Sequence, residues 1–367
     1  METIIIFRIG SIGDTVVALP CFHRIARSFP NSRRIVVTDV PASQKATSVE
    51  SILGRSGLVD DIIHFPPSPR KGRDILNLRD RIRATKSRTL IYIADRNVLS
   101  TLRDICFFRS CGIRHVIGAP LKRDLRVPRV DPESGFTERE AARLARCLAS
   151  LGAIDLEDPG FWDLCLQPDE ISIGDRELAP LGGSDFIAVN IGGKVASKDW
   201  GNDNWTALFR LIAAAHGDLG LVFVGSADEF DRAAVLAATW PGPTLNLCGA
   251  LGARESAAAM KRAMLFVGHD SGPIHLAAAA GVPCVGIFGA FNRPKWWHPI
   301  GQGHSIIHNM SGVREIAPGE VYAAVHQTIA QVAARTSGQK FGAGLENLSS
   351  EAKLARERND VFQRSVT

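Results

Sequence analysis

The sequence lacks the features that mark membrane-spanning, secreted and disulfide-stabilised proteins. In its 367 residues, no apolar run approaches the roughly 18 residues that a membrane-spanning helix needs. The N-terminus has neither the basic segment nor the long apolar segment of a signal peptide. The seven cysteines include no Cys-x-x-Cys pair, and the closest two, Cys106 and Cys111, have no further ligands for a metal site. These absences predict a cytoplasmic protein with free thiols and no metal.

Acidic residues are scarce in the first third of the chain. Residues 1–130 hold 23 Lys and Arg against 11 Asp and Glu, a net charge of +12, whereas residues 131–367 hold 20 against 27, a net charge of −7. The basic part predicts an anionic surface or substrate, although its densest stretch, 70–88, also reads as a solvated helix face. No zinc finger, helix-turn-helix or RNA-binding aromatic signature accompanies it, so we expect no nucleic-acid partner.

Strand-like runs alternate with segments long enough for helices, which predicts an α/β fold with parallel sheets. One series of runs occupies 4–9, 34–40, 89–95 and 115–119, and a second occupies 186–191, 219–225, 244–249, 264–268 and 283–289. We therefore expect an N-terminal domain over 1–165, a polar linker over 166–185, and a C-terminal domain over 186–332. A charged helical tail, 333–367, is expected to fray or to pack back on the first domain.

The first strand-like run ends in Gly-Ser-Ile-Gly-Asp, residues 10–14. Its glycines permit a tight turn, and the segment that follows predicts a helix whose first amides can hold an anion. Asp14 has two possible roles at this helix start, a cap that satisfies free amides or a functional carboxylate in a cleft between the domains.

A second strand–turn–helix follows residue 264. Asp270, Ser271 and Gly272 form the turn, Pro273 suits the first helical turn, and the small residues of the helix allow close packing on the sheet. Such a helix start favours a phosphate or diphosphate. His275, on the first turn, could contact this ligand or be a buried core histidine.

Together, GSIGDTVVALP and GHDSGPIHLAAAAGVPCVGIFG resemble the two signature segments of glycosyltransferase family 9, the ADP-heptose:lipopolysaccharide heptosyltransferases and their relatives. KDWGNDNWTALFRLI also resembles an intermediate segment of that family, so the likeness covers roughly residues 1–330. It implies a GT-B architecture, two Rossmann-like domains that face each other across a cleft. It also implies inverting, metal-independent sugar transfer, with the nucleotide sugar on the C-terminal domain and the acceptor on the N-terminal one.

The resemblance assigns roles residue by residue. Asp14 matches the catalytic carboxylate, in an acceptor-side loop with Ser11 and Gly13. The donor-binding residues it implies are Lys198 at the phosphates, Glu229 at the ribose, and Asp270, Ser271, Gly272, Pro273 and His275 in the turn. The plainer alternatives are an ion pair of Lys198 with Asp199 or Asp203, and a solvated helix start for Glu229.

The chain departs from the family pattern in two loops. Lys194 stands where a hydroxyl residue often helps to bind phosphate, and we include it among the donor-binding residues. Ala290 and Phe291 replace a Pro-Thr pair, and Trp296 and Trp297 follow, either as sugar-stacking or as packing residues.

The sequence therefore predicts a glycosyltransferase that needs no cofactor and uses a nucleotide-diphosphate sugar, heptose or a related one, as donor. The acceptor is expected to be an anionic glycan or glycolipid, such as the lipopolysaccharide core, reached at the inner face of the cytoplasmic membrane. The alternatives are a nucleotide-sugar epimerase of the same fold and a non-catalytic nucleotide-sugar-binding protein. A dinucleotide oxidoreductase is weaker, because Gly-Ser-Ile-Gly-Asp lacks the complete Gly-x-Gly-x-x-Gly fingerprint.

Overall fold

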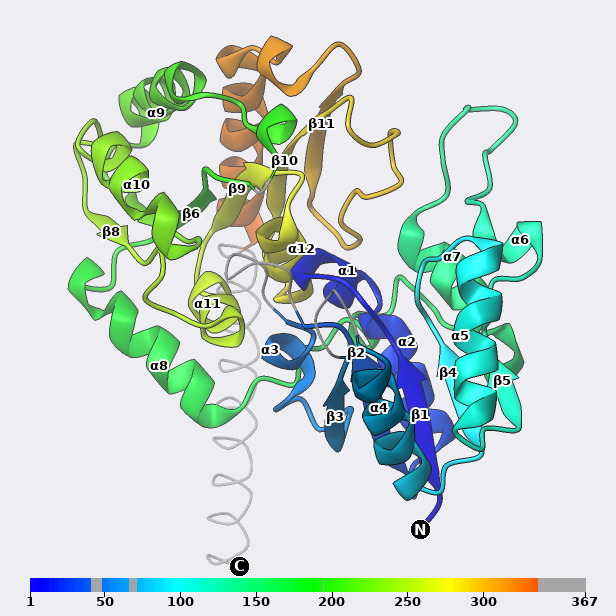
Figure 1. Cartoon of the computed structure of the whole chain (residues 1–367). Helices are drawn as coiled ribbons and strands as arrows, with labels where there is room; N and C mark the ends of the chain where they lie inside the picture. Colours follow the sequence, from blue (N-terminus) through cyan, green and yellow to red (C-terminus); the bar gives the residue numbers. More distant parts are fainter. Residues whose placement is uncertain (41–47, 66–70, 194, 336–367) are drawn as a thin grey trace, which may run out of the picture.

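Two parallel β-sheets with helices on both faces make up the molecule (Figure 1). The computed structural model describes residues 1–40, 48–65, 71–193 and 195–335. Within these residues the first sheet has the strand order β3-β2-β1-β4-β5 and the second has the order β11-β10-β9-β6-β7-β8. The α/β fold with two parallel sheets is as predicted. Lys194, and the part of the expected tail from residue 336 on, lie outside the described residues.

The first sheet begins the chain. Its strands are β1 (Thr3–Phe7), β2 (Arg33–Thr38), β3 (Asp61–His64), β4 (Thr89–Tyr92) and β5 (His115–Ile117). Its helices are α1 (Ile12–Val17), α2 (Leu19–Ser28), α3 (Glu50–Leu53), α4 (Gly72–Ala84), α5 (Val98–Ser110), α6 (Arg123–Arg126) and α7 (Glu140–Cys147). Side chains from α4 and α5 cover one face of the sheet, and side chains from α2, α3 and α7 cover the other.

The second sheet follows a helical connection, α8 (Pro168–Leu178). Its strands are β6 (Phe186–Asn190), β7 (Gly220–Phe223), β8 (Thr244–Asn246), β9 (Leu265–His269), β10 (Cys284–Gly289) and β11 (Ser305–Asn309). Its helices are α9 (Asn202–His216), α10 (Phe230–Ala237), α11 (Ala253–Met260) and α12 (Gly272–Ala279), and a further helix over 318–335 packs on the same core. Short 3₁₀ turns include η4 (Ala196–Lys198) and η5 (Ala227–Glu229).

The segment expected as a linker, 166–185, is folded. Its helix α8 packs against α11 of the second domain, where Gly174 leaves room for the α11 backbone. Arg254 of α11 bonds both carboxylate oxygens of Glu170 at 2.7 and 2.8 Å, and both side chains are buried. The same guanidinium donates to the carbonyl of Ile52 in the first domain at 2.7 Å. Arg254 therefore joins the connecting helix α8 to residues of both domains. The domain boundaries themselves stay a prediction.

Candidate functional site

The glycine loop after β1 holds Asp14 in a fixed position. Gly10 has φ +129°, and a Cβ there would lie 2.5 Å from the Asp14 Cβ, so the turn requires glycine. Asp14 is the third residue of α1, and its Oδ2 accepts from the Ser11 backbone N–H at 2.8 Å and from Ser11 Oγ at 3.1 Å. In the described part of the chain, its Oδ1 makes no hydrogen bond. The carboxylate therefore caps the helix and still has one oxygen for a ligand.

Arg8 lies directly after β1, and its guanidinium hydrogen-bonds the backbone of the Asp14 loop and of the segment after β4. It is 2% exposed, and its Nη1 donates to the Ile93 carbonyl at the end of β4 at 2.6 Å. Its Nη2 donates to the backbone carbonyl of Asp14. The sequence analysis missed this residue, although an arginine inside an apolar strand run, directly before a glycine loop, is a readable signal.

The N-termini of α1 and α12 meet between the two sheets, at the centre of the molecule in Figure 1. A Cβ on Gly272 would lie 2.8 Å from Ile12 Cβ, and one on Gly13 would lie 3.4 Å from His275 Cδ2. These glycines therefore let the two helix starts approach closely. Asp14 and the turn at 270–272 are brought to one cleft although they are far apart in the sequence.

Lys198, the last residue of η4, lines this cleft and pairs with Asp270, its Nζ 2.9 Å from Oδ2. Neither of the expected alternatives, Asp199 and Asp203, is its partner; Asp199 pairs with Arg232 at 2.8 Å. Asp270 is buried at the end of β9 and also accepts from Asn292 at 2.6 Å.

One of the departures from the family pattern lies against this pair. The ring of Phe291 lies 4.3 Å from Lys198 Nζ, a cation–π contact. The loop after β10 therefore contributes to holding the lysine, through Phe291 and its neighbour Asn292.

A hydrogen-bonded chain runs from the α12 turn to Glu229. Ser271 Oγ donates to Asn190 Oδ1 at 3.2 Å, and Asn190 Nδ2 donates to Glu229 Oε2 at 3.1 Å. Burial raises the pKa of the Glu229 carboxyl. A Cβ on Gly192 or Gly225 would lie within 2.2 Å of Glu229 side-chain atoms, so these glycines make its seat. Glu229 thus lies in the cleft wall, as the half-buried N-cap residue of α10.

His275 and Pro273 complete the first turn of α12. His275 is 5% exposed, and burial lowers the pKa of its imidazole to about 4, so the ring is neutral at pH 7. Its ring lies edge-on to Trp297 with the centroids 6.1 Å apart. His275 is therefore a buried histidine that also lines the cleft, so the two roles expected for it are compatible.

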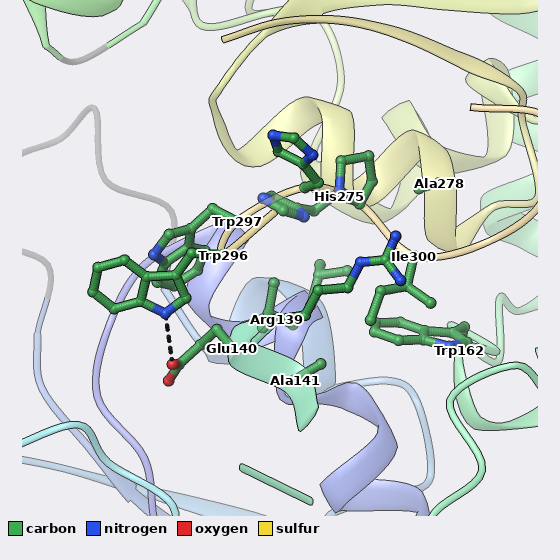
Figure 2. Close-up of a pocket in the computed structure, with 13 residues that line it drawn as sticks. Arg139, Glu140, Ala141, Trp162, His275, Ala278, Trp296, Trp297 and Ile300 are labelled. Atoms are coloured by element: carbon green, nitrogen blue, oxygen red, sulfur yellow. Dashed lines mark hydrogen bonds between the residues drawn. The ribbon is translucent and has the colours of Figure 1, made fainter. Parts of the chain in front are cut away.

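Trp296 and Trp297, in the loop after β10, lie next to residues of the first domain around Glu140 (Figure 2). Trp296 Nε1 donates to Glu140 Oε2 at 3.1 Å, and the Glu140 backbone N–H donates to the Trp296 carbonyl at 2.9 Å. Glu140 is in turn held by the buried guanidinium of Arg143, with Nε 2.8 Å from Oε2. Trp296 is therefore a packing residue between the domains, whereas Trp297 also lines the main cleft.

The cleft between the sheets has a volume of about 1050 Å³. Apart from Lys194, every site residue named from the sequence lines it: Ser11, Gly13, Asp14, Lys198, Glu229, Asp270, Ser271, Gly272, Pro273 and His275. The loop expected on the acceptor side and the residues expected to bind the donor therefore line the same space. The cleft can accommodate an anionic ligand at Lys198 and the α12 amides, with a carboxylate opposite.

Part of the chain matches a known family model. Residues 139–316 match the model described as Glycosyltransferase family 9 (heptosyltransferase). A curated relative, lipopolysaccharide heptosyltransferase 3 of Escherichia coli, is 29% identical over 125 residues, which are 33% of this chain and 36% of the relative. The match thus spans about a third of the curated relative's length. Asp14 lies outside the region that the family model covers.

Solved structures share the fold over most of the chain. A family 9 glycosyltransferase from Veillonella parvula has a TM-score of 0.71 at 18% identity, covering 90% of this chain and 98% of its own. ADP-heptose lipopolysaccharide heptosyltransferase II of Escherichia coli has a TM-score of 0.65 at 17% identity, covering 90% and 99%. The GT-B architecture is therefore confirmed, and so is the resemblance to glycosyltransferase family 9, which the family model locates at residues 139–316.

Proposed function

We propose that the protein is an inverting, metal-independent glycosyltransferase that moves a sugar, heptose or a related one, from a nucleotide diphosphate to a glycan acceptor. The observation that carries the proposal is that Asp14 and Lys198 line the same cleft from opposite domains. The family 9 likeness of residues 139–316 supports a nucleotide-sugar donor. The acceptor is an anionic glycan or glycolipid, such as the lipopolysaccharide core, and the enzyme meets it peripherally at the inner face of the cytoplasmic membrane.

The acceptor hydroxyl needs a base, because it is a poor nucleophile at neutral pH. Oδ1 of Asp14 is the atom available to take its proton, since Oδ2 is held by Ser11. The acceptor oxygen forms a bond to the anomeric carbon from the face opposite the diphosphate. The bond from that carbon to the diphosphate oxygen breaks, and its electron pair leaves with the nucleoside diphosphate, so the anomeric configuration inverts.

The leaving group develops negative charge, which Lys198 and the free amides of the first turn of α12 are placed to stabilise. Asp270 then acts by holding the ammonium of Lys198 in position with Asn292 behind it. Glu229, with Gly192 and Gly225 packed against its side chain, forms the part of the cleft wall at which we place the ribose. These positive groups do the work that a divalent cation performs in other transferases, which is the reason for proposing a metal-independent reaction.

A transfer assay tests the function. The full-length protein is incubated with a panel of nucleotide-diphosphate sugars and a soluble glycan acceptor, and the products are analysed by mass spectrometry and NMR. We expect a glycoconjugate with inverted anomeric configuration and one nucleoside diphosphate released per sugar transferred. An epimerised sugar formed without acceptor would identify an epimerase instead, and donor binding without any product would identify a binding protein.

The donor side is tested separately with Lys198→Ala. We expect donor affinity, measured by calorimetry, to fall by about tenfold or more, because a charged hydrogen bond to the diphosphate is lost. The variant Asp270→Asn, which keeps the lysine, is the companion: it should weaken binding less. Unchanged affinity in Lys198→Ala would reject the assignment of Lys198.

A further inference from the structure

Phe291 is a large apolar side chain that is exposed inside the cleft. It lies in the loop after β10, is 56% exposed and lines the cleft. The Nζ of Lys198 lies over its ring, 4.3 Å from the centroid. Single exposed apolar side chains are ordinary on an outer surface. One that lines a ligand cleft beside a charged side chain is instead a candidate contact for the ligand.

The position of the Phe291 ring is fixed from two directions. Asn292, the next residue, is buried, and its Nδ2 donates to Asp270 Oδ2 at 2.6 Å. The same carboxylate oxygen pairs with Lys198 Nζ at 2.9 Å. The backbone beside Phe291 and the ammonium over its ring therefore belong to one hydrogen-bonded group. A ring that is held in place before a ligand arrives loses little freedom on binding, which favours affinity.

The inference rests on the proposed function, which puts the diphosphate of the donor at Lys198. A phosphate oxygen that accepts from this ammonium lies about 2.8 Å from Nζ. The anomeric carbon of the sugar is bonded to the diphosphate through one oxygen. In the proposed reaction, the acceptor that Asp14 activates approaches that carbon from the opposite face. The sugar therefore lies between Asp14 and Lys198, within reach of the Phe291 ring.

The charges of the cleft restrict the kind of sugar. Among the described residues that line it, seven Asp and Glu side chains stand against three Lys and Arg side chains. Each of the three cations, Arg55, Lys198 and Arg254, pairs with a carboxylate. A sugar with its own carboxylate would be repelled by this acidic lining, whereas a neutral sugar would not.

We propose that Phe291 is the platform on which the sugar of the donor packs, and that this sugar is an uncharged pyranose. A pyranose ring presents C–H bonds on its face, and these lose contact with water when they pack on a phenyl ring. Phe291 then contacts the substrate directly, in addition to holding Lys198. The contact sets the anomeric carbon between the base and the leaving group.

Calorimetry on the full-length protein tests this contact with ligands that differ in the sugar. The probes are ADP and ADP-glucose, and UDP, UDP-glucose and UDP-glucuronate. The sugar's contribution is the dissociation constant of the nucleoside diphosphate divided by that of its glucose conjugate. In Phe291→Ala we expect this ratio to fall by about five- to tenfold, because the sugar no longer buries part of a phenyl side chain. Phe291→Tyr, which keeps the ring, should retain the ratio of the parent.

The ratio separates a sugar contact from an indirect effect through Lys198. ADP and ADP-glucose both carry the diphosphate, and ADP has the greater negative charge. A displaced lysine would therefore weaken ADP binding at least as much as ADP-glucose binding. If the ratio in Phe291→Ala equals that of the parent, Phe291 does not contact the sugar and the inference is wrong. UDP-glucuronate bound as tightly as UDP-glucose would contradict the uncharged sugar.

Phe136 offers a matched control. Its ring lies 4.0 Å from Lys295 Nζ, in the same kind of cation–π contact, and it is not among the residues that line the cleft. Phe136→Ala should leave the ratio unchanged. A fall as large as that in Phe291→Ala would show that the loss does not come from a contact in the cleft, and would overturn the inference. Circular dichroism of each variant confirms that the fold is retained.

The outcome is separable from that of the proposed function. A protein that transfers sugar, but whose ratio does not change in Phe291→Ala, overturns the platform and leaves the transferase intact. A protein whose ratio falls in Phe291→Ala, but which transfers no sugar to any acceptor, keeps the platform and overturns the transferase. A parent that binds none of the probes overturns the donor site at Lys198, and the platform with it.

Discussion

Replacing Asp14 by Asn separates its two roles, because the structure shows what each would lose. The amide oxygen of Asn can still accept from the Ser11 backbone N–H and Oγ, at present 2.8 and 3.1 Å from Oδ2. The bonds become neutral, and a favourable charge at the helix N-terminus disappears. Together these changes cost about 1 to 3 kcal/mol of the free energy of unfolding. A protein with about 5 to 15 kcal/mol of stability remains folded after this loss.

The catalytic loss should be larger. The atom facing the acceptor becomes either an amide nitrogen or an oxygen too weakly basic to take a proton. Loss of a general base lowers the rate by about a hundred- to ten-thousand-fold, equivalent to about 2.7 to 5.5 kcal/mol of activation free energy. Donor affinity should change little, because in the proposed function the donor is held mainly by Lys198 and the α12 turn, which do not contact the substituted carboxylate oxygen. We therefore expect a folded variant with near-normal donor binding and turnover reduced by at least about a hundredfold.

The assay measures nucleoside diphosphate release at saturating donor, with the donor dissociation constant from calorimetry. Asp74 offers a matched control, since it is the third residue of α4 and its Oδ2 accepts from the Lys71 backbone N–H at 3.0 Å in the same arrangement. Asp74→Asn should lose comparable stability and no turnover. If Asp14→Asn turns over within a few-fold of the parent, Asp14 is only a cap and the reasoning fails.

Three further perturbations follow from contacts in the structure. Gly10→Ala should lower turnover by about a hundredfold because its Cβ displaces Asp14. Gly112→Ala is the control for backbone strain alone, because Gly112 has φ +101° and open space around it. An equal loss of turnover in both variants would contradict this explanation. Burial holds the pKa of His275 at about 4, below 6.5, so the stability it contributes is lost as pH falls from 6.5 to 4. In His275→Gln, the free energy of unfolding, measured with urea, should depend less steeply on pH between 4 and 6.5. The slope should fall by up to about 1.4 kcal/mol per pH unit, and an unchanged slope would refute this. Arg254→Met should cost about 3 to 5 kcal/mol in the same assay, whereas Arg33→Ala, in its exposed pair with Asp61, should cost under about 1 kcal/mol. Similar costs would disprove a stabilising buried contact between Arg254 and Glu170.

Local sequence patterns were sufficient for most strands and for both helix starts of the site. The β-branched run before Gly10 and the apolar run before Asp270 become β1 and β9, and the glycine-containing turns after them open α1 and α12 as predicted. Two edge strands were missed. β3 and β11 are short, at four and five residues, and each carries a histidine or other polar residues, so they lack a long apolar run. Backbone pairing with β2 and β10 stabilises these two strands, although their own sequences carry no clear strand pattern.

The connection at 166–185 shows a similar limit. Its proline, glycine and charged residues predict a linker, yet 168–178 forms α8. The helix is stabilised by burial against α11 and by the Glu170–Arg254 pair, 84 positions apart in the chain. Neither contribution is visible in the local sequence, because both depend on how the second domain docks.

The sequence by itself determined which residue types line the cleft, because a glycine turn and a helix start are local structures that a few neighbouring residues specify. It did not determine their partners. That Lys198 pairs with Asp270, that Trp296 bonds Glu140, and that one oxygen of Asp14 stays available are decided by the tertiary structure. The physical reason is that these contacts join residues that the docking of two sheets brings together, and short-range hydrogen bonds and ion pairs form only at the final distance and angle.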